Sequence, residues 1–148
     1  MSIAMSTQAE HAVQWARDKA AYDRVSTNSG HLLLALVDLN IVPVASFGGN
    51  FDYTSLRLEI NQGLALCRWG RQDLGIDAPS FKKSLSLAMD DAVTTKSQLI
   101  TPAHLLLAVA LEPTGPAGWV LAKWLRRDHT EIRRAVRSER YQYRAVAA

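Results

Sequence analysis

The stretch His31-Leu32-Leu33-Leu34-Ala35-Leu36 returns 73 positions later as His104-Leu105-Leu106-Leu107-Ala108-Val109. Its surroundings return with it: spaced alanines precede each copy, and an Asp-(x)3-Leu/Ile-Arg sequence follows each one. Repetition at a fixed spacing over most of a chain indicates a duplicated supersecondary unit. The sequence therefore predicts two copies of one helical unit, packed face to face. The other matching segments are Ala16 and Ala20 with Ala88 and Ala92, and 52–60 with 128–136.

Each leucine-rich stretch is predicted to be a central buried helix, because it is apolar nearly all round. Asn28 is the expected N-cap of the first of these helices. In the second copy Thr101 is the expected N-cap, and Pro102 takes the first helical position, where its missing N–H costs nothing. His31 and His104 then stand at equivalent helix starts. We expect both to be structural, hydrogen-bonding a loop or the partner copy.

The flanking segments also have helical patterns. A helix is predicted over about 7–22, where Thr7 and Glu10 have capping-box spacing and the alanines share one face. The stretch 67–80 lacks helical periodicity and contains two glycines and a proline, so we expect a loop there. No run alternates with period two, which favours an all-α fold. Further helices are expected over about 29–39 and 43–47, from Asp52 with Leu56, Ile60 and Leu64 buried, over 115–125, and from Asp128.

Length and composition limit the class of protein. The chain has 148 residues, 48% of them hydrophobic, enough for one domain with a core of its own. Its single cysteine, Cys67, excludes an intrachain disulfide and fits a reducing compartment. The longest apolar run, 32–37, is too short for a membrane span, and the first ten residues lack the features of a secretory signal. We therefore expect a cytoplasmic protein that does not enter a membrane.

No known catalytic or metal-binding pattern is found in the sequence. The four histidines lack metal-ligand spacing, and the phosphate loop, the nucleophile elbow and the dinucleotide-binding glycine pattern are missing. Asp90 and Asp91 are adjacent on a helix and diverge, so we interpret them as part of a solvated face. Cys67 is interpreted as an idle thiol. We expect no catalytic residues, no metal and no cofactor, and hence no enzyme.

Taken together, the ordered and repeated set of motifs resembles the Clp N-terminal domain, over about residues 7–138. The stretch Ala78-Pro79-Ser80-Phe81-Lys82-Lys83 also resembles the start of that family's second repeat, including its Lys-Lys pair. The resemblance implies two four-helix repeats in a pseudo-twofold arrangement. We expect repeat one over about 7–66, a linker over 67–79, repeat two over 80–140 and a basic tail over 141–148.

The resemblance also implies a function. In the Clp AAA+ unfoldases this domain is a mobile appendage that binds adaptors and client segments and has no enzymatic activity. Because the ATPase phosphate loop is missing, we expect a free-standing version that binds clients, adaptors or Clp subunits and modulates proteolysis. Some family members bind phosphorylated arginine through a glutamate before each histidine. Gly30 and Ala103 take those positions here, so we expect no preference for phosphoarginine.

Four residues form a candidate partner-binding surface, because tryptophan and arginine are the types most enriched at binding hot spots: Arg68, Trp69, Arg71 and Trp119. Trp15 and Trp124 are instead expected in the core. Oligomeric state stays open between a monomer and a weak dimer.

The alternative function is nucleic-acid binding through an arginine-rich C-terminal helix. Residues 101–148 carry eight Lys or Arg against four Asp or Glu, and arginines could neutralise phosphates. A formal net charge of only +3 and two interrupting glutamates weaken this interpretation. The arginines concerned are Arg126, Arg127, Arg133, Arg134, Arg137, Arg140 and Arg144.

Overall fold

The computed structural model of the chain describes residues 3–41, 53–67 and 77–125. Within these ranges the fold is all-α, with two isolated β-bridges and no strand. The expected short helix at 43–47 and the last helix from Asp128 lie outside the described residues. The helices are α1 (Thr7–Tyr22), α2 (Ser29–Asp38), α3 (Tyr53–Cys67), α4 (Pro79–Thr94), α5 (Pro102–Leu111) and α6 (Pro116–Leu125).

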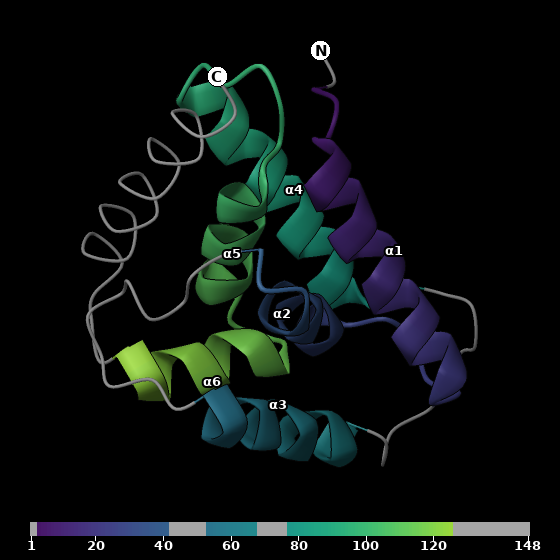
Figure 1. Ribbon diagram of the computed structural model, residues 1–148. Coiled ribbons are helices and arrows are strands. Elements are labelled where there is room, and N and C mark those ends of the chain that lie inside the picture. The colour runs from purple at the N-terminus through teal and green to yellow at the C-terminus, as the bar shows by residue number, and fades with distance from the viewer. Residues whose placement is uncertain (1–2, 42–52, 68–76, 126–148) are drawn as a thin grey trace.

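The two leucine-rich helices form the centre of the molecule, as predicted (Figure 1). Helix α2 packs against α5, and every residue from Ser29 to Val37 is buried. The same is true of α5 from Pro102 to Val109. Leu56, Ile60 and Leu64 of α3 are buried too, as the sequence predicts. Burial of this many large apolar side chains is the main favourable term in folding.

The packing of the helices is symmetric between the two copies. Helix α1 packs against α2 of its own repeat and against α5 of the other repeat. Helix α4 likewise packs against α5 and against α2. The remaining two, α3 and α6, are not counterparts in the two copies; they pack against each other and against α2, and α6 also packs against α5 (Figure 1). The expected pseudo-twofold arrangement is therefore present in the described helices.

The segment before each repeat pairs with a loop of the other repeat. Met5, before α1, forms a parallel bridge with Ile100, before α5. Asp77, before α4, forms the equivalent bridge with Thr27, before α2. These bridges tie the two copies together through backbone hydrogen bonds, among them Ala78 N–H to the Thr27 carbonyl at 2.6 Å.

The ends of α1 and α4 are also alike. Arg24 and Lys96, each just after the helix, have left-handed backbone conformations with φ of 58° and 55°. In both cases the left-handed residue and the one after it donate N–H groups to the last turn of the helix. This hydrogen-bond pattern is the Schellman motif, which usually has glycine at the left-handed position. The copies thus share a backbone feature that their side chains do not show.

The N-cap of α1 differs from the prediction by one residue. Ser6, not Thr7, is the N-cap, and its hydroxyl accepts the Ala9 N–H at 3.1 Å. The Ser6 N–H donates to the Ile100 carbonyl at 2.9 Å, which is part of the bridge between the repeats. That contact holds Ser6 in the extended conformation that an N-cap requires, so Thr7 becomes the first helical residue.

Candidate functional site

The starts of α2, α4 and α6 meet between the two repeats. The Ser29 N–H, in the first turn of α2, donates to Ser80 Oγ of α4 at 3.1 Å. Ser29 Oγ in turn accepts the Ala117 N–H of α6 at 3.3 Å. Each N–H belongs to the first turn of a helix, where no intrahelical acceptor exists. Two buried serines therefore satisfy these helix ends and join three helices.

Glycines allow the helix starts to approach this closely. A Cβ atom on Gly30 would lie 2.7 Å from Pro116 Cγ and 2.8 Å from Leu64 Cδ2. A Cβ atom on Gly115 would overlap the hydroxyl of Ser29. Contacts this short do not occur between real side chains, so neither glycine can gain a side chain without movement of its neighbours.

A cleft of about 330 Å³ lies beside this junction. The start of α4 and the segment before α6 contribute to its lining together with Asn28 and Leu64. Its walls are largely apolar, from Val25, Leu64, Pro79 and Pro116, and its polar lining includes Asn28 and Ser80. A concave, mainly apolar surface with a few placed polar groups is the usual form of a binding site.

The two histidines are structural, as the sequence predicts. His31 Nδ1 accepts the N–H of Asn28 at 3.1 Å, and His104 Nδ1 accepts the N–H of Thr101 at 2.9 Å. Each ring is almost wholly buried and completes a capping box with its N-cap residue. An imidazole that accepts through Nδ1 carries its proton on Nε2 when neutral.

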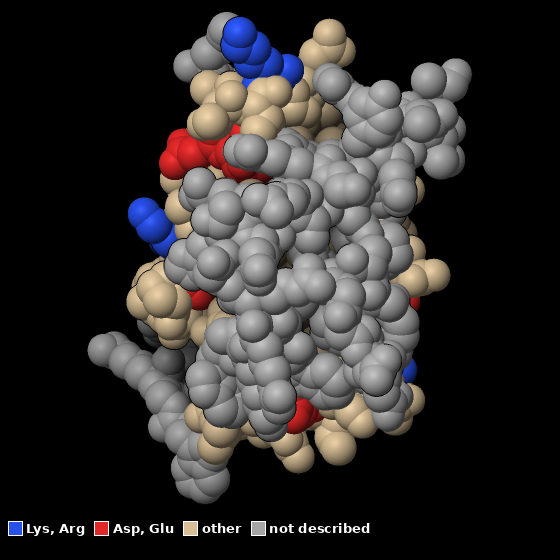
Figure 2. Space-filling model, turned by 90° about the vertical axis from the view of Figure 1, so that its left-hand side faces the viewer, with Lys and Arg blue, Asp and Glu red and all other residues tan. Residues whose placement is uncertain are grey.

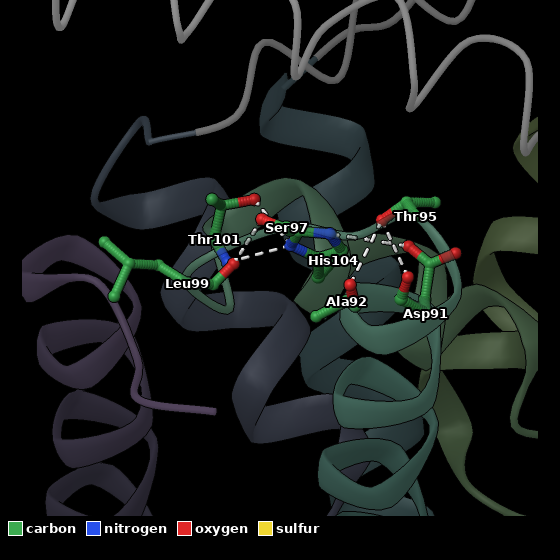
Figure 3. A network of polar contacts seen from close by, with 7 residues as sticks. All are labelled: Asp91, Ala92, Thr95, Ser97, Leu99, Thr101 and His104. Carbon is green, nitrogen blue, oxygen red and sulfur yellow. Dashed lines mark hydrogen bonds and ion pairs between the residues drawn. The ribbon is translucent and has the colours of Figure 1, made fainter. Parts of the chain in front are cut away.

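The interpretation of Asp91 as part of a solvated face is wrong. Its carboxylate is mostly buried, and Oδ2 lies 3.7 Å from Nε2 of His104 (Figure 3). Thr95 lies beside it and donates its hydroxyl to the Asp91 carbonyl at 2.8 Å. Asp90, its neighbour, is exposed as expected. The side chain of Asp91 is directed inward because α4 packs against the start of α5, a contact that adjacent sequence does not reveal.

The side chains of the predicted partner-binding surface are not among those that the structure describes. Arg68, Trp69 and Arg71 fall in 68–76, and the side chain of Trp119 in α6 is likewise not described. Trp15, expected in the core, is half-buried and packs against it, and the side chain of Trp124 is not described. Sequence reasoning did not find the cleft, although Asn28 was recognised as an N-cap. Only the close spacing of glycine, proline and serine at 28–30, 79–80 and 115–116 hinted at it.

On the face shown in Figure 2, the described residues form no continuous basic patch. The described Lys and Arg side chains lie at separate places there, with Asp and Glu among them. No cluster of three or more metal-ligating side chains occurs in the described ranges. None of the described helices is long and apolar enough to cross a membrane. The arginines of 126–144 lie outside the described residues.

Comparison with solved structures identifies the fold. The N-terminal domain of Hsp104 from Candida albicans matches with a TM-score of 0.72 and 13% identity, covering 90% of this chain and 89% of that one. The chain has the fold of a Clp N-terminal domain. The N-terminal domain of ClpD from Arabidopsis thaliana matches with a TM-score of 0.66 and 19% identity, covering 90% and 95%.

A third Clp N-terminal domain has the same fold. The N-terminal domain of the ClpV1 ATPase from E. coli matches with a TM-score of 0.65 and 16% identity, covering 88% of this chain and 82% of that one. No family model matches the sequence, and no curated protein matches it either. The structural matches therefore confirm the Clp N-domain fold that the repeated leucine stretch predicts.

Proposed function

We propose that this chain is a non-enzymatic protein-interaction module of a Clp system, which binds clients, adaptors or Clp subunits and modulates proteolysis. The observation that carries the proposal is the Clp N-domain fold, which extends over about 90% of the chain. One further matching structure, at a TM-score of 0.66 and 16% identity, is of a peptide from the EAEC T6SS Sci1 SciI protein. The cleft between the repeats gives this chain a concave surface of its own for such a segment.

Affinity capture tests the proposal. The tagged full chain would be incubated with source lysate, and the bound proteins quantified by mass spectrometry against an unrelated tagged protein. We expect Clp ring or protease subunits, or their clients, to be enriched, and untagged chain to compete for them. A bound fraction made up of nucleic acid would instead favour the arginine-rich C-terminal segment as the functional element. Its binding would fall steeply between two salt concentrations in a mobility-shift assay.

The same capture experiment tests the proposed surface of Arg68, Trp69, Arg71 and Trp119. Trp69→Ala and Trp119→Ala are expected to lower the amount of bound partner, because aromatic anchors carry a large share of binding energy. Tyr22→Ala is the matched control, since Tyr22 is 84% exposed and lies outside this surface. Unchanged capture by both tryptophan variants would show that partners bind elsewhere.

The chain should not prefer peptides that carry phosphorylated arginine. Gly30 packs against Pro116 and Leu64, and Ala103 is buried, so neither position offers a carboxylate to a guanidinium group. We expect phosphoarginine and arginine forms of one peptide to bind with equal affinity within about twofold, measured by calorimetric titration. A preference of about tenfold for the phosphorylated form would contradict this.

A further inference from the structure

Two hydrogen-bond donors in the lining of the cleft have no acceptor among the described residues. Asn28 Oδ1 accepts the Gly30 N–H at 2.8 Å, so the other arm of the amide is the NH₂ group. That group has no acceptor among the described residues, although Asn28 is only 9% exposed. Ser80 is 7% exposed, and its Oγ accepts from Ser29 while its own proton has no described acceptor. Both residues line the cleft, so these donors are available to an acceptor that a ligand brings into it.

The start of α4 adds a third source of positive potential. Its N-cap, Ala78, has no side chain that could accept a hydrogen bond. Pro79 has no N–H and the Phe81 N–H donates to the Ala78 carbonyl, which leaves the Ser80 N–H as the one in the first turn without a described acceptor. The starts of the two neighbouring helices already have acceptors, Asn28 Oδ1 for α2 and Ser29 Oγ for α6. A helix of 16 residues presents partial positive charge at such an end. The cleft thus combines unused donors with an uncapped helix start.

The rest of the lining decides which acceptor fits. Among the described lining residues there is no Lys, Arg, Asp or Glu, so a doubly charged phosphate would find none of the cations that usually accompany it there. A carboxylate carries one charge and is well served by neutral N–H and O–H donors. The apolar walls of Val25, Leu64 and Pro116 suit a hydrocarbon side chain beside it. The small volume, about 330 Å³, suits the end of a peptide better than a passing strand.

We propose that this cleft binds the C-terminal carboxylate of a partner polypeptide whose last residue is apolar. The carboxylate accepts from the Asn28 amide and from the hydroxyl and backbone N–H of Ser80 in the first turn of α4, and the last side chain lies against the apolar walls. This assignment rests on the proposed function and names the partner chemistry that one site of the module recognises.

A peptide library gives the first test. Hexapeptides with randomised sequences and an apolar last residue would be passed over the immobilised full chain, once as free acids and once as C-terminal amides. We expect the free acids to be retained about tenfold more than the amides, because amidation removes the charge. Equal retention of both, or retention of neither, would overturn the proposal. Amides that bind through an internal Asp or Glu as well as free acids do would also overturn it.

A matched pair of variants gives the second test. Asn28→Asp keeps an oxygen that caps α2 but replaces the donor with a second, negatively charged acceptor. We expect this variant to keep its melting temperature and to bind the selected peptide about tenfold or more weakly. Asn61→Asp, at an exposed position of α3 outside the described cleft lining, makes the same charge change and should leave binding within about twofold. Equal binding by Asn28→Asp and Asn61→Asp would overturn the proposal.

Spectroscopy on the wild-type chain locates the ligand independently of any variant. In a ¹⁵N-correlated spectrum, the side-chain NH₂ signals of Asn28 should shift as the selected peptide is added. If they stay in place while peptide binds, the cleft is not the site. Clp subunits captured by a chain that retains no peptide would leave the proposed function standing and remove only the carboxylate site.

Discussion

The starts of α2 and α5 make the same hydrogen bond in different surroundings. In each helix the imidazole of the third residue accepts the N–H of the N-cap residue, Asn28 in one case and Thr101 in the other. The start of α2 then faces α4 and α6 across a cleft and is joined to both by Ser29. The start of α5 instead brings its histidine beside the carboxylate of Asp91.

This comparison distinguishes the features that both copies share from those that only one copy has. The histidine cap and the leucine core occur in both copies, so they serve the fold that the copies share. The copies differ in the residue before the histidine, which is Gly30 or Ala103, and in the partner of the ring. Lys19 stands in α1 where Asp91 stands in α4, and it pairs with Asp23 instead. One start of the duplicated unit is therefore shaped for close packing beside a cleft, and the other for a buried polar contact.

The largest expected effect concerns the leucine core, which both copies share. Leu33 and Leu106 occupy equivalent positions, and both are essentially fully buried. Leu33→Ala and Leu106→Ala should each lower the free energy of unfolding by about 2–5 kcal/mol, because each leaves a cavity. Urea denaturation at equilibrium measures both. Leu58→Ala is the control, since Leu58 is exposed and its loss should cost less than about 0.5 kcal/mol. A strongly unequal pair would show that the copies do not support the fold equally.

The next effect tests the histidine cap. His31→Ala and His104→Ala each leave an N-cap N–H without its acceptor, buried at Asn28 and partly buried at Thr101. Each should reduce the free energy of unfolding by about 1–3 kcal/mol, the usual cost of an unsatisfied buried donor. Chemical denaturation at neutral pH measures the change. A negligible loss in either variant would mean that water replaces the ring at that helix start.

A double-mutant cycle sharpens this comparison. Asp91→Asn combined with His104→Ala should show a coupling of at least about 0.5 kcal/mol, because the two side chains are in contact. Asp91→Asn combined with His31→Ala serves as the control and should be additive within about 0.5 kcal/mol. Coupling of the same size in both cycles would contradict the assignment of Asp91 to one copy only.

A smaller effect tests the residue before each histidine. Helix propensity alone predicts that Gly30→Ala stabilises the protein by about 1 kcal/mol. The short approach of Pro116 and Leu64 predicts the opposite, and overpacking of this kind costs about 1–3 kcal/mol. We expect the packing cost to exceed the propensity gain, with a net loss of stability in thermal denaturation. Ala103→Gly, the reverse change in the other copy, should lose about 0.5–1 kcal/mol from propensity. A Gly30→Ala variant more stable than the wild type would show that Pro116 and Leu64 move at little cost to accommodate the added methyl group.

Local signals were enough to predict much of the fold. The bounds of α1, the N-caps Asn28 and Thr101 and the buried faces of the helices all follow from periodicity and capping residues. The choice between Ser6 and Thr7 as N-cap could not be made locally, because both carry hydroxyls. The hydrogen bond from the Ser6 N–H to the carbonyl of Ile100, a residue of the second repeat, makes Ser6 the N-cap.

The candidate site was beyond sequence reasoning for the same physical reason. The cleft exists because three helix starts, at Ser29, Pro79 and Pro116, come together in space. Each start alone has the sequence of an ordinary helix end, and the donors of Asn28 and Ser80 come to share one cleft only once the described helices are placed. The inward position of Asp91 depends likewise on a contact between two helices.

The smallest expected effect concerns a feature that neither copy reveals in sequence. Arg24 and Lys96 hold left-handed conformations that cost a side-chain-bearing residue about 1–2 kcal/mol. Glycine removes that cost but adds about 0.5–1 kcal/mol of unfolded-state entropy to be lost on folding. Arg24→Gly and Lys96→Gly should therefore each raise the free energy of unfolding by up to about 1 kcal/mol, measured by urea denaturation. Because the two Schellman motifs are alike, the two gains should be equal and additive. A gain at one position only would place the next difference between the copies at the ends of α1 and α4.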